Sequence, residues 1–108
     1  RAALVLARDE GAALVITTGG TGIGPRDITP DVVMSLADKT IPGIMEHIRI
    51  KFGTEKPNAL WSRSVAAILG KTMVFTLPGS VKAVDEYMGE ISKSLEHALY
   101  MLYGLDTH

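Results

Sequence analysis

The most constraining feature of the sequence is a glycine-rich segment, residues 19–25, which holds four glycines and ends in a proline. A helix does not survive that composition, so the segment is a loop. It follows residues 13–17, an apolar run rich in β-branched side chains that is typical of a buried parallel strand. Thr29, Pro30 and Asp31 come next and suit an N-cap and the first turn of a helix. The pattern predicts a strand, a loop and a helix in succession.

The same order recurs later in the chain. An apolar run at residues 72–77 leads into Pro78-Gly79-Ser80, and helical spacing of apolar residues then extends to a C-cap at Gly104. Residues 64–68 precede the run across Leu69-Gly70-Lys71, which predicts a hairpin. Ligands of open α/β sheets bind beyond the carboxyl ends of the strands. Both glycine loops are therefore expected at one sheet edge, where they would share a ligand site.

Helical patterns also cover residues 2–10 and 41–52, with a polar loop expected at residues 53–58. Helices that alternate with apolar strands favour an α/β sandwich. With 108 residues, of which 46% are hydrophobic, the chain is one domain or a piece of one and is not disordered. Its first residue is Arg1, within a helical pattern that has no cap, so we expect the chain to be part of a longer protein.

Charge and cysteine content exclude several functions. The chain has 11 basic and 12 acidic residues and a net charge of −1. It therefore lacks the excess of positive charge that non-specific nucleic-acid binding needs. It has no polybasic run and no apolar stretch near the roughly 20 residues that span a bilayer. The absence of cysteine excludes disulfides, thiolate nucleophiles and thiolate metal sites, and fits a reducing compartment.

The first glycine loop has the residue types of a phosphate site. Backbone N–H groups of successive glycines can surround an anion, and threonine hydroxyls add donors. Neither the P-loop nor the dinucleotide-binding fingerprint fits: Gly70-Lys71-Thr72 has Val65 where a P-loop needs glycine. An ordinary glycine-rich turn is the alternative. Arg26 could clamp a phosphate or lie in solvent, and Asp27 could hold Mg²⁺ or cap the turn locally with Arg26 or Thr29.

Two other segments carry weaker signals. Pro78-Gly79-Ser80 places a helix start at the expected site edge, although Ser80 could be an N-cap and nothing more. Ser62-Arg63-Ser64 offers donors for a phosphate or a pterin edge, or is a simple turn. The three histidines, His47, His97 and His108, lack metal-ligand spacing and are expected on surface or helix faces.

Several motifs together resemble the MoaB/Mog family of molybdenum-cofactor biosynthesis, which includes molybdopterin adenylyltransferases and gephyrin G domains. Thr-Thr-Gly-Gly-Thr-Gly at residues 17–22, Pro-Arg-Asp at 25–27 and Thr29-Pro30 resemble its first signature. Residues 41–43 resemble the segment before its middle helix, and residues 60–64 its Leu-Ser-Arg segment, with Trp61 where a smaller apolar residue is usual. Residues 77–80 resemble its second signature.

The resemblance implies a three-layer α/β sandwich with a mostly parallel sheet. Residues 1–108 would form a single molybdopterin-binding domain that lacks its N-terminal part, including the first strands. The implied reaction is Mg-ATP-dependent adenylylation of molybdopterin, in which AMP passes to the terminal phosphate and pyrophosphate leaves. A non-catalytic molybdopterin-binding or scaffold domain is the alternative. We expect catalysis of the full-length parent rather than of these 108 residues alone.

The resemblance also assigns roles to residues. Asp27 is the implied catalytic residue and Mg²⁺ ligand. The implied contacts to molybdopterin and ATP are Thr18, Gly19, Gly20, Thr21, Gly22, Arg26, Ser62, Arg63, Pro78, Gly79 and Ser80. The family further implies a cytoplasmic homotrimer whose product passes to a molybdate-insertion enzyme, with no nucleic-acid or membrane partner.

Overall fold

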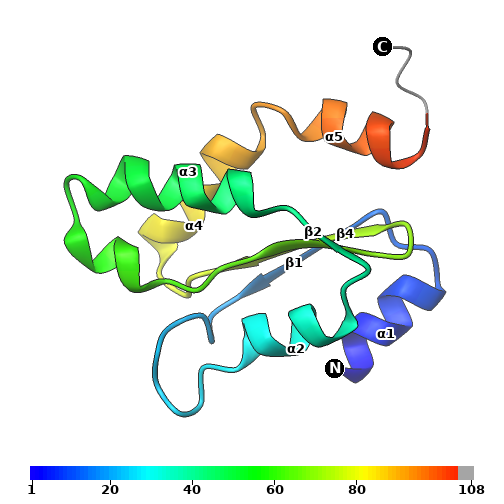
Figure 1. The fold of residues 1–108 in the computed structure, drawn as a ribbon, viewed down its shortest axis with the longest axis horizontal. Helices are drawn as coiled ribbons and strands as arrows, with labels where there is room; N and C mark the ends of the chain where they lie inside the picture. Colours follow the sequence, from blue (N-terminus) through cyan, green and yellow to red (C-terminus); the bar gives the residue numbers. More distant parts are fainter. Residues whose placement is uncertain (105–108) are drawn as a thin grey trace.

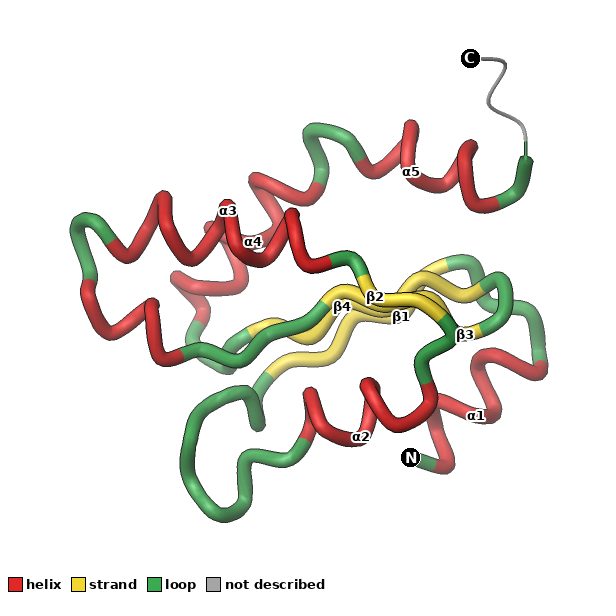
Figure 2. The backbone as a smooth tube through the Cα atoms, viewed as in Figure 1, coloured by secondary structure: helices red, strands yellow, loops and turns green. Residues whose placement is uncertain are grey.

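The computed structural model describes residues 1–104, which form a sheet between two layers of helices (Figure 1). Helices α1 (Ala2–Asp9) and α2 (Thr29–Leu36) cover one face of the sheet. Helices α3 (Pro42–Gly53), α4 (Val81–Ile91) and α5 (Leu95–Leu102) lie on the other, as the red segments above and below the yellow strands in Figure 2 show. The three-layer α/β sandwich expected from the sequence is confirmed.

The sheet has the strand order β1-β4-β3-β2. Its strands are β1 (Leu14–Thr18), β2 (Lys39–Thr40), β3 (Ala66–Leu69) and β4 (Thr72–Leu77). Only β1 and β4 pair in parallel; the β2–β3 and β3–β4 pairs are antiparallel. The expectation of a mostly parallel sheet is therefore wrong for these strands. Gly70, at φ +61°, and Lys71 join β3 directly to β4, and so tight a turn can connect only antiparallel strands.

Every residue of β3 and β4 is buried, because helices cover both faces of these central strands. Alternate side chains point to opposite faces. Phe75 and Leu77 pack against α3 and α4 in one apolar cluster, together with Ile48. Val74 and Leu69 pack on the other side, with Val33 of α2 and Leu4 of α1. Two buried interfaces thus fix the sheet between its helical layers.

The prediction of one long helix over residues 81–104 is wrong. The helix is interrupted at residues 92–94, where the Lys93 N–H donates to the Glu90 carbonyl and the Ser94 N–H donates to the Ile91 carbonyl, each at 3.3 Å. These three-residue spacings replace the four-residue ladder of an α-helix. The Ser92 hydroxyl also donates to the Gly89 carbonyl, at 3.2 Å, so a serine competes with the backbone ladder at this point.

Two local boundaries also differ from expectation. Helix α2 begins at Thr29, with Ile28 at the N-cap position, so Thr29 is not the N-cap. The segment expected to be a polar loop contains the start of a 3₁₀ helix, η1 (Pro57–Trp61). Such short turns leave too few residues for a sequence period to reveal them.

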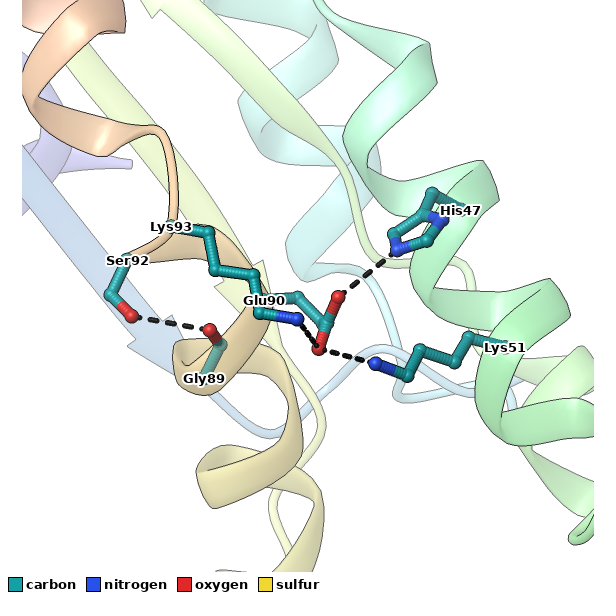
Figure 3. Close-up of polar contacts among 6 residues, drawn as sticks. All are labelled: His47, Lys51, Gly89, Glu90, Ser92 and Lys93. Atoms are coloured by element: carbon teal, nitrogen blue, oxygen red, sulfur yellow. Dashed lines mark hydrogen bonds and ion pairs between the residues drawn. The ribbon is translucent and has the colours of Figure 1, made fainter.

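Glu90 is a charged residue of α4, yet its side chain is only 8% exposed. Figure 3 shows its carboxylate facing α3: Oε1 lies 3.0 Å from His47 Nε2, and Oε2 accepts from Lys51 Nζ at 2.9 Å. Lys93 Nζ donates to the same Oε2, also at 2.9 Å. Hydrogen bonds from Lys51, Lys93 and His47 lower the pKa of Glu90 to about 2. This cluster joins α4 to α3.

The surface placement expected for the histidines holds where it can be examined. His47 is largely exposed although it contacts Glu90, and His97 lies on the exposed side of α5. His108 lies outside the described residues. No group of three or more His, Asp or Glu side chains within residues 1–104 is arranged to hold a metal ion.

Candidate functional site

The two glycine loops meet at one edge of the sheet, as the sequence predicted. Strands β1 and β4 are parallel neighbours, with Thr18 opposite Leu77, so the loops after them start side by side. The Gly19 N–H donates to the Leu77 carbonyl at 2.8 Å. A Cβ built on Gly79 would lie 3.4 Å from the Gly19 Cα. That distance is an ordinary van der Waals contact, so the two loops lie directly against each other.

A pocket of about 650 Å³ opens where these loops meet. Both loops, α3, η1 and the first turns of α4 contribute to its wall. Of the residues implied by sequence, nine line it: Gly19, Gly20, Thr21, Gly22, Asp27, Ser62, Pro78, Gly79 and Ser80. Three others, Thr18, Arg26 and Arg63, are not among the lining residues. The structure therefore brings most of the predicted set together.

Four consecutive residues of the first loop line the pocket and have unpaired backbone N–H groups. Within residues 1–104, the amides of Gly20, Thr21, Gly22 and Ile23 donate to no protein acceptor. Thr21 is nevertheless buried. Buried backbone donors are nearly always satisfied, so consecutive unpaired amides in a pocket suit an anionic ligand.

Asp27 lines the pocket. Its Oδ2 also accepts from the Gly24 N–H at 2.9 Å, which makes it a local cap of the loop. Neither Arg26 nor Thr29 is its partner. A Cβ on Gly22 or Gly24 would lie 2.9 Å from the same Oδ2, so the glycines make room for the carboxylate.

Arg63 does not face the pocket. Its backbone N–H donates to the Thr21 carbonyl at 2.7 Å, and its guanidinium binds the first loop and Asp31. Its neighbour Ser62 does line the pocket. The Ser62 hydroxyl accepts a hydrogen bond from the Tyr87 hydroxyl at 3.3 Å and shares another with the Ser64 hydroxyl at 2.9 Å. Ser62 is thus held in the pocket wall by a short chain of hydroxyl groups.

Ser80 lines the pocket and is also the N-cap of α4, where its hydroxyl accepts from the Ala83 N–H at 3.1 Å. The cap predicted as the alternative to ligand binding is therefore present, and it leaves the start of α4 at the pocket. The positive end of a helix favours a negative ligand there.

Several lining residues were not recognised as site residues from sequence. Lys56 forms an ion pair with Glu86 and lies 5.6 Å from the centre of the Phe52 ring. Lys82 stands near the start of α4. Trp61 lines the pocket with 64% of its surface exposed. Phe52 ends the helical pattern of residues 41–52, but only the packing of α3 beside α4 puts these side chains around one cavity.

Fold and site together define an α/β domain with a pocket suited to an anionic ligand at the carboxyl edge of β1 and β4. The sequence of residues 1–97 matches the family described as "Probable molybdopterin binding domain". The chain therefore belongs to this family, as its motifs indicated.

Named relatives agree with this assignment. The chain is 40% identical over 90 residues to gephyrin from Dictyostelium discoideum, covering 82% of this chain and 12% of that protein. It is 41% identical over 81 residues to molybdopterin adenylyltransferase from Haemophilus influenzae, covering 75% of this chain and 41% of that protein. The chain thus spans less than half of either relative.

A solved structure has the same fold. The molybdopterin biosynthesis Mog protein from Mycobacterium ulcerans aligns with a TM-score of 0.91 at 35% identity, over 95% of this chain and 67% of that one. Within residues 1–104, the helices are too short or too polar to cross a membrane.

Proposed function

We propose that this chain is the molybdopterin-binding part of an enzyme of molybdenum-cofactor biosynthesis that adenylylates molybdopterin. One observation carries the proposal: two glycine loops from adjacent parallel strands line a single pocket, and four consecutive lining residues of the first loop have unpaired amides. Relatives named molybdopterin adenylyltransferase support the choice of reaction.

In the proposed reaction an oxygen of the terminal phosphate of molybdopterin attacks the α-phosphorus of ATP. The bond from this phosphorus to the bridging oxygen breaks, and pyrophosphate leaves with the electron pair. Such transfers depend mainly on positioning and electrostatic stabilisation, and need no covalent nucleophile on the protein. The amides of Gly20 to Ile23 and the start of α4 would bind phosphate oxygens, while Ser62 would hydrogen-bond the pterin part.

Magnesium fits this pocket through Asp27. Among the carboxylates that line it, Glu86 is paired with Lys56, whereas Asp27 takes part in no ion pair within residues 1–104. Mg²⁺ usually takes one or two carboxylates and completes its shell with substrate phosphates and water. When bound, the ion would neutralise charge on the phosphates. Asp27 would hold it while Gly24 fixes the orientation of the carboxylate.

A non-catalytic molybdopterin-binding or scaffold domain is the second candidate. It is favoured by the small number of charged groups available in the pocket, since Lys56 and Glu86 neutralise each other and Arg63 is turned away. For the first candidate we also propose a cytoplasmic location and a homotrimeric assembly. A second enzyme, which inserts molybdate, would take up the adenylylated product.

The test is to incubate the full-length protein with molybdopterin and Mg-ATP and to measure adenylylated molybdopterin and pyrophosphate. Equal amounts of the two products, absent when Mg²⁺ is chelated, are expected for the transferase. Saturable binding of molybdopterin without either product would establish the passive binder instead. Absence of both binding and turnover would contradict both candidates.

A further inference from the structure

Arg63 binds the first glycine loop and is not among the residues that line the pocket. Its Nε donates to the Gly22 carbonyl at 2.8 Å, and its Nη2 donates to the Asp27 carbonyl. Nη1 and Nη2 form a two-pronged pair with Asp31 at 3.0 and 3.1 Å. These bonds use four of the five guanidinium N–H groups, so little capacity is left for a ligand.

The direction of these bonds determines where the loop amides point. In a trans peptide the carbonyl and the following N–H point in opposite directions. The Thr21 carbonyl is bound by the Arg63 N–H and the Gly22 carbonyl by Arg63 Nε. The N–H groups of Gly22 and Ile23 therefore point away from Arg63, and Gly22 and Ile23 are the residues that line the pocket.

We infer that Arg63 is a positioning residue: together with Asp31 it keeps the carbonyls of the loop turned away from the pocket, so that the amides of Gly22 and Ile23 can receive a phosphate group. This inference rests on the proposed function for the identity of the ligand. Glycine peptides rotate easily because no Cβ opposes the change. Without Arg63, a carbonyl could face the phosphate and repel it.

The ion pair supports the same assignment. The hydrogen bond from Arg63 lowers the pKa of Asp31, and Asp31 raises the pKa of Arg63. Asp31 lies in the first turn of α2, so the pair also ties the loop to the helix that follows it. A lysine cannot reproduce this geometry, because an ammonium group is a point donor and lacks the planar fork of a guanidinium.

The experiment compares Arg63→Lys and Asp31→Asn with the wild type, in the full-length protein. The first readout is the set of backbone amide NMR signals of residues 20–24 without ligand. The second is affinity for inorganic pyrophosphate, and the third is the melting temperature. Asp85→Asn is the matched control, because Asp85 is an exposed carboxylate on α4 outside the pocket lining.

The two possible roles of Arg63 predict opposite changes in pyrophosphate affinity for Asp31→Asn. A positioning residue loses its anchor, so pyrophosphate affinity falls roughly tenfold even though a negative charge has been removed. An arginine that bound the anion directly would be released by this change, and affinity would rise at least as much as in Asp85→Asn. That rise would overturn the inference.

Arg63→Lys keeps the charge, so the positioning role predicts a similar fall in affinity together with shifted or broadened signals from residues 20–24. A lower melting temperature with unchanged loop signals and unchanged affinity would identify a purely stabilising residue and would also overturn the inference. If the wild type does not bind pyrophosphate, the proposed function loses its support. The loop signals of the two variants still decide the role of Arg63 in that case.

Discussion

Asp27 has a structural role in the loop and a proposed role in the reaction. It lines the pocket, and its carboxylate accepts a hydrogen bond from the Gly24 N–H. An asparagine at this position retains an oxygen that can accept the same bond, whereas an alanine does not. Comparing Asp27→Asn with Asp27→Ala therefore separates the effect of losing the charge from the effect of losing the hydrogen bond that caps the loop.

We expect Asp27→Asn to abolish adenylyl transfer in the full-length protein while molybdopterin binding and the melting temperature change little. The reason is that a magnesium-organising carboxylate acts where charge moves between phosphates. The measurement is product formation and melting temperature at saturating Mg-ATP. Asp27→Ala should lose turnover and, in addition, about 1 kcal/mol of stability with the cap. Unchanged turnover in Asp27→Asn would remove Asp27 from the catalytic machinery.

Alanine substitutions at Gly19 and Gly20 can be compared to measure how much steric contact with Thr29 restricts the loop. Both have positive φ, +87° and +71°, so alanine at either position carries a strain of about 1–2 kcal/mol. A Cβ on Gly20 would also lie 2.4 Å from the Thr29 hydroxyl oxygen, while one on Gly19 meets nothing within 4 Å. We expect Gly20→Ala to lower the free energy of unfolding more than Gly19→Ala, as measured by urea denaturation. Equal losses would show that Thr29 moves aside freely.

At the scale of secondary-structure elements, the pocket depends on how α3 and α4 are held together. Helix α3 contributes Phe52 to the wall, and α4 contributes Glu86 and Tyr87. The Glu90 cluster joins the same two helices through Lys51 and His47, and Glu90 lies one helical turn after the lining residue Glu86. The break after Ile91 brings Lys93 to the same carboxylate. This cluster therefore acts on the spacing of the pocket wall.

Acid should weaken this connection. The pKa of Glu90 is lowered from 4.5 to about 2, so the charged carboxylate stabilises the folded state above pH 4.5, and this contribution is lost as the pH falls toward 2. We expect Glu90→Gln to lower the melting temperature most near neutral pH, with the difference from wild type shrinking below pH 4.5. Glu46→Gln, an exposed residue of α3, is the control and should show no such trend. A difference that is constant across this range would contradict the assignment.

At the scale of the whole molecule, large exposed apolar side chains lie on several elements, and α5 carries two of them. Tyr100 is 48% exposed and Met101 54%. Large exposed apolar groups often mark contact surfaces. Combined with the family assignment, they support the prediction of a homotrimer.

We expect light scattering of the full-length protein to give the mass of a trimer at micromolar concentration. Burial of α5 in the contact predicts that Met101→Lys shifts the protein toward smaller species, because a charge would have to be buried without a partner. Glu55→Gln makes the same change in net charge on an exposed loop and should leave the mass unaltered. A monomer mass for the wild type would contradict the prediction.

Local sequence was sufficient for much of the fold and for most of the pocket wall. Four glycines and a proline exclude any regular structure at residues 19–25, and the apolar runs on either side of Gly70 specify a hairpin. Parallel neighbours end at the same edge, so the meeting of the Gly19–Gly22 loop with Gly79 followed from strand order alone. The loop and the hairpin depend on residues close together in the chain, where backbone sterics and periodicity act directly, whereas the parallel pairing of β1 with β4 joins distant residues.

Only the tertiary structure decided the features that depend on distant partners. Glu90 has the side chain of an exposed helix residue, and its burial follows from Lys51 and His47, more than 35 residues away. Arg63 has a side chain that could bind a phosphate, yet its N–H groups donate to the Gly22 carbonyl and to Asp31 instead. A polar side chain pairs with whatever the fold places within hydrogen-bond distance, and the sequence does not encode that distance locally.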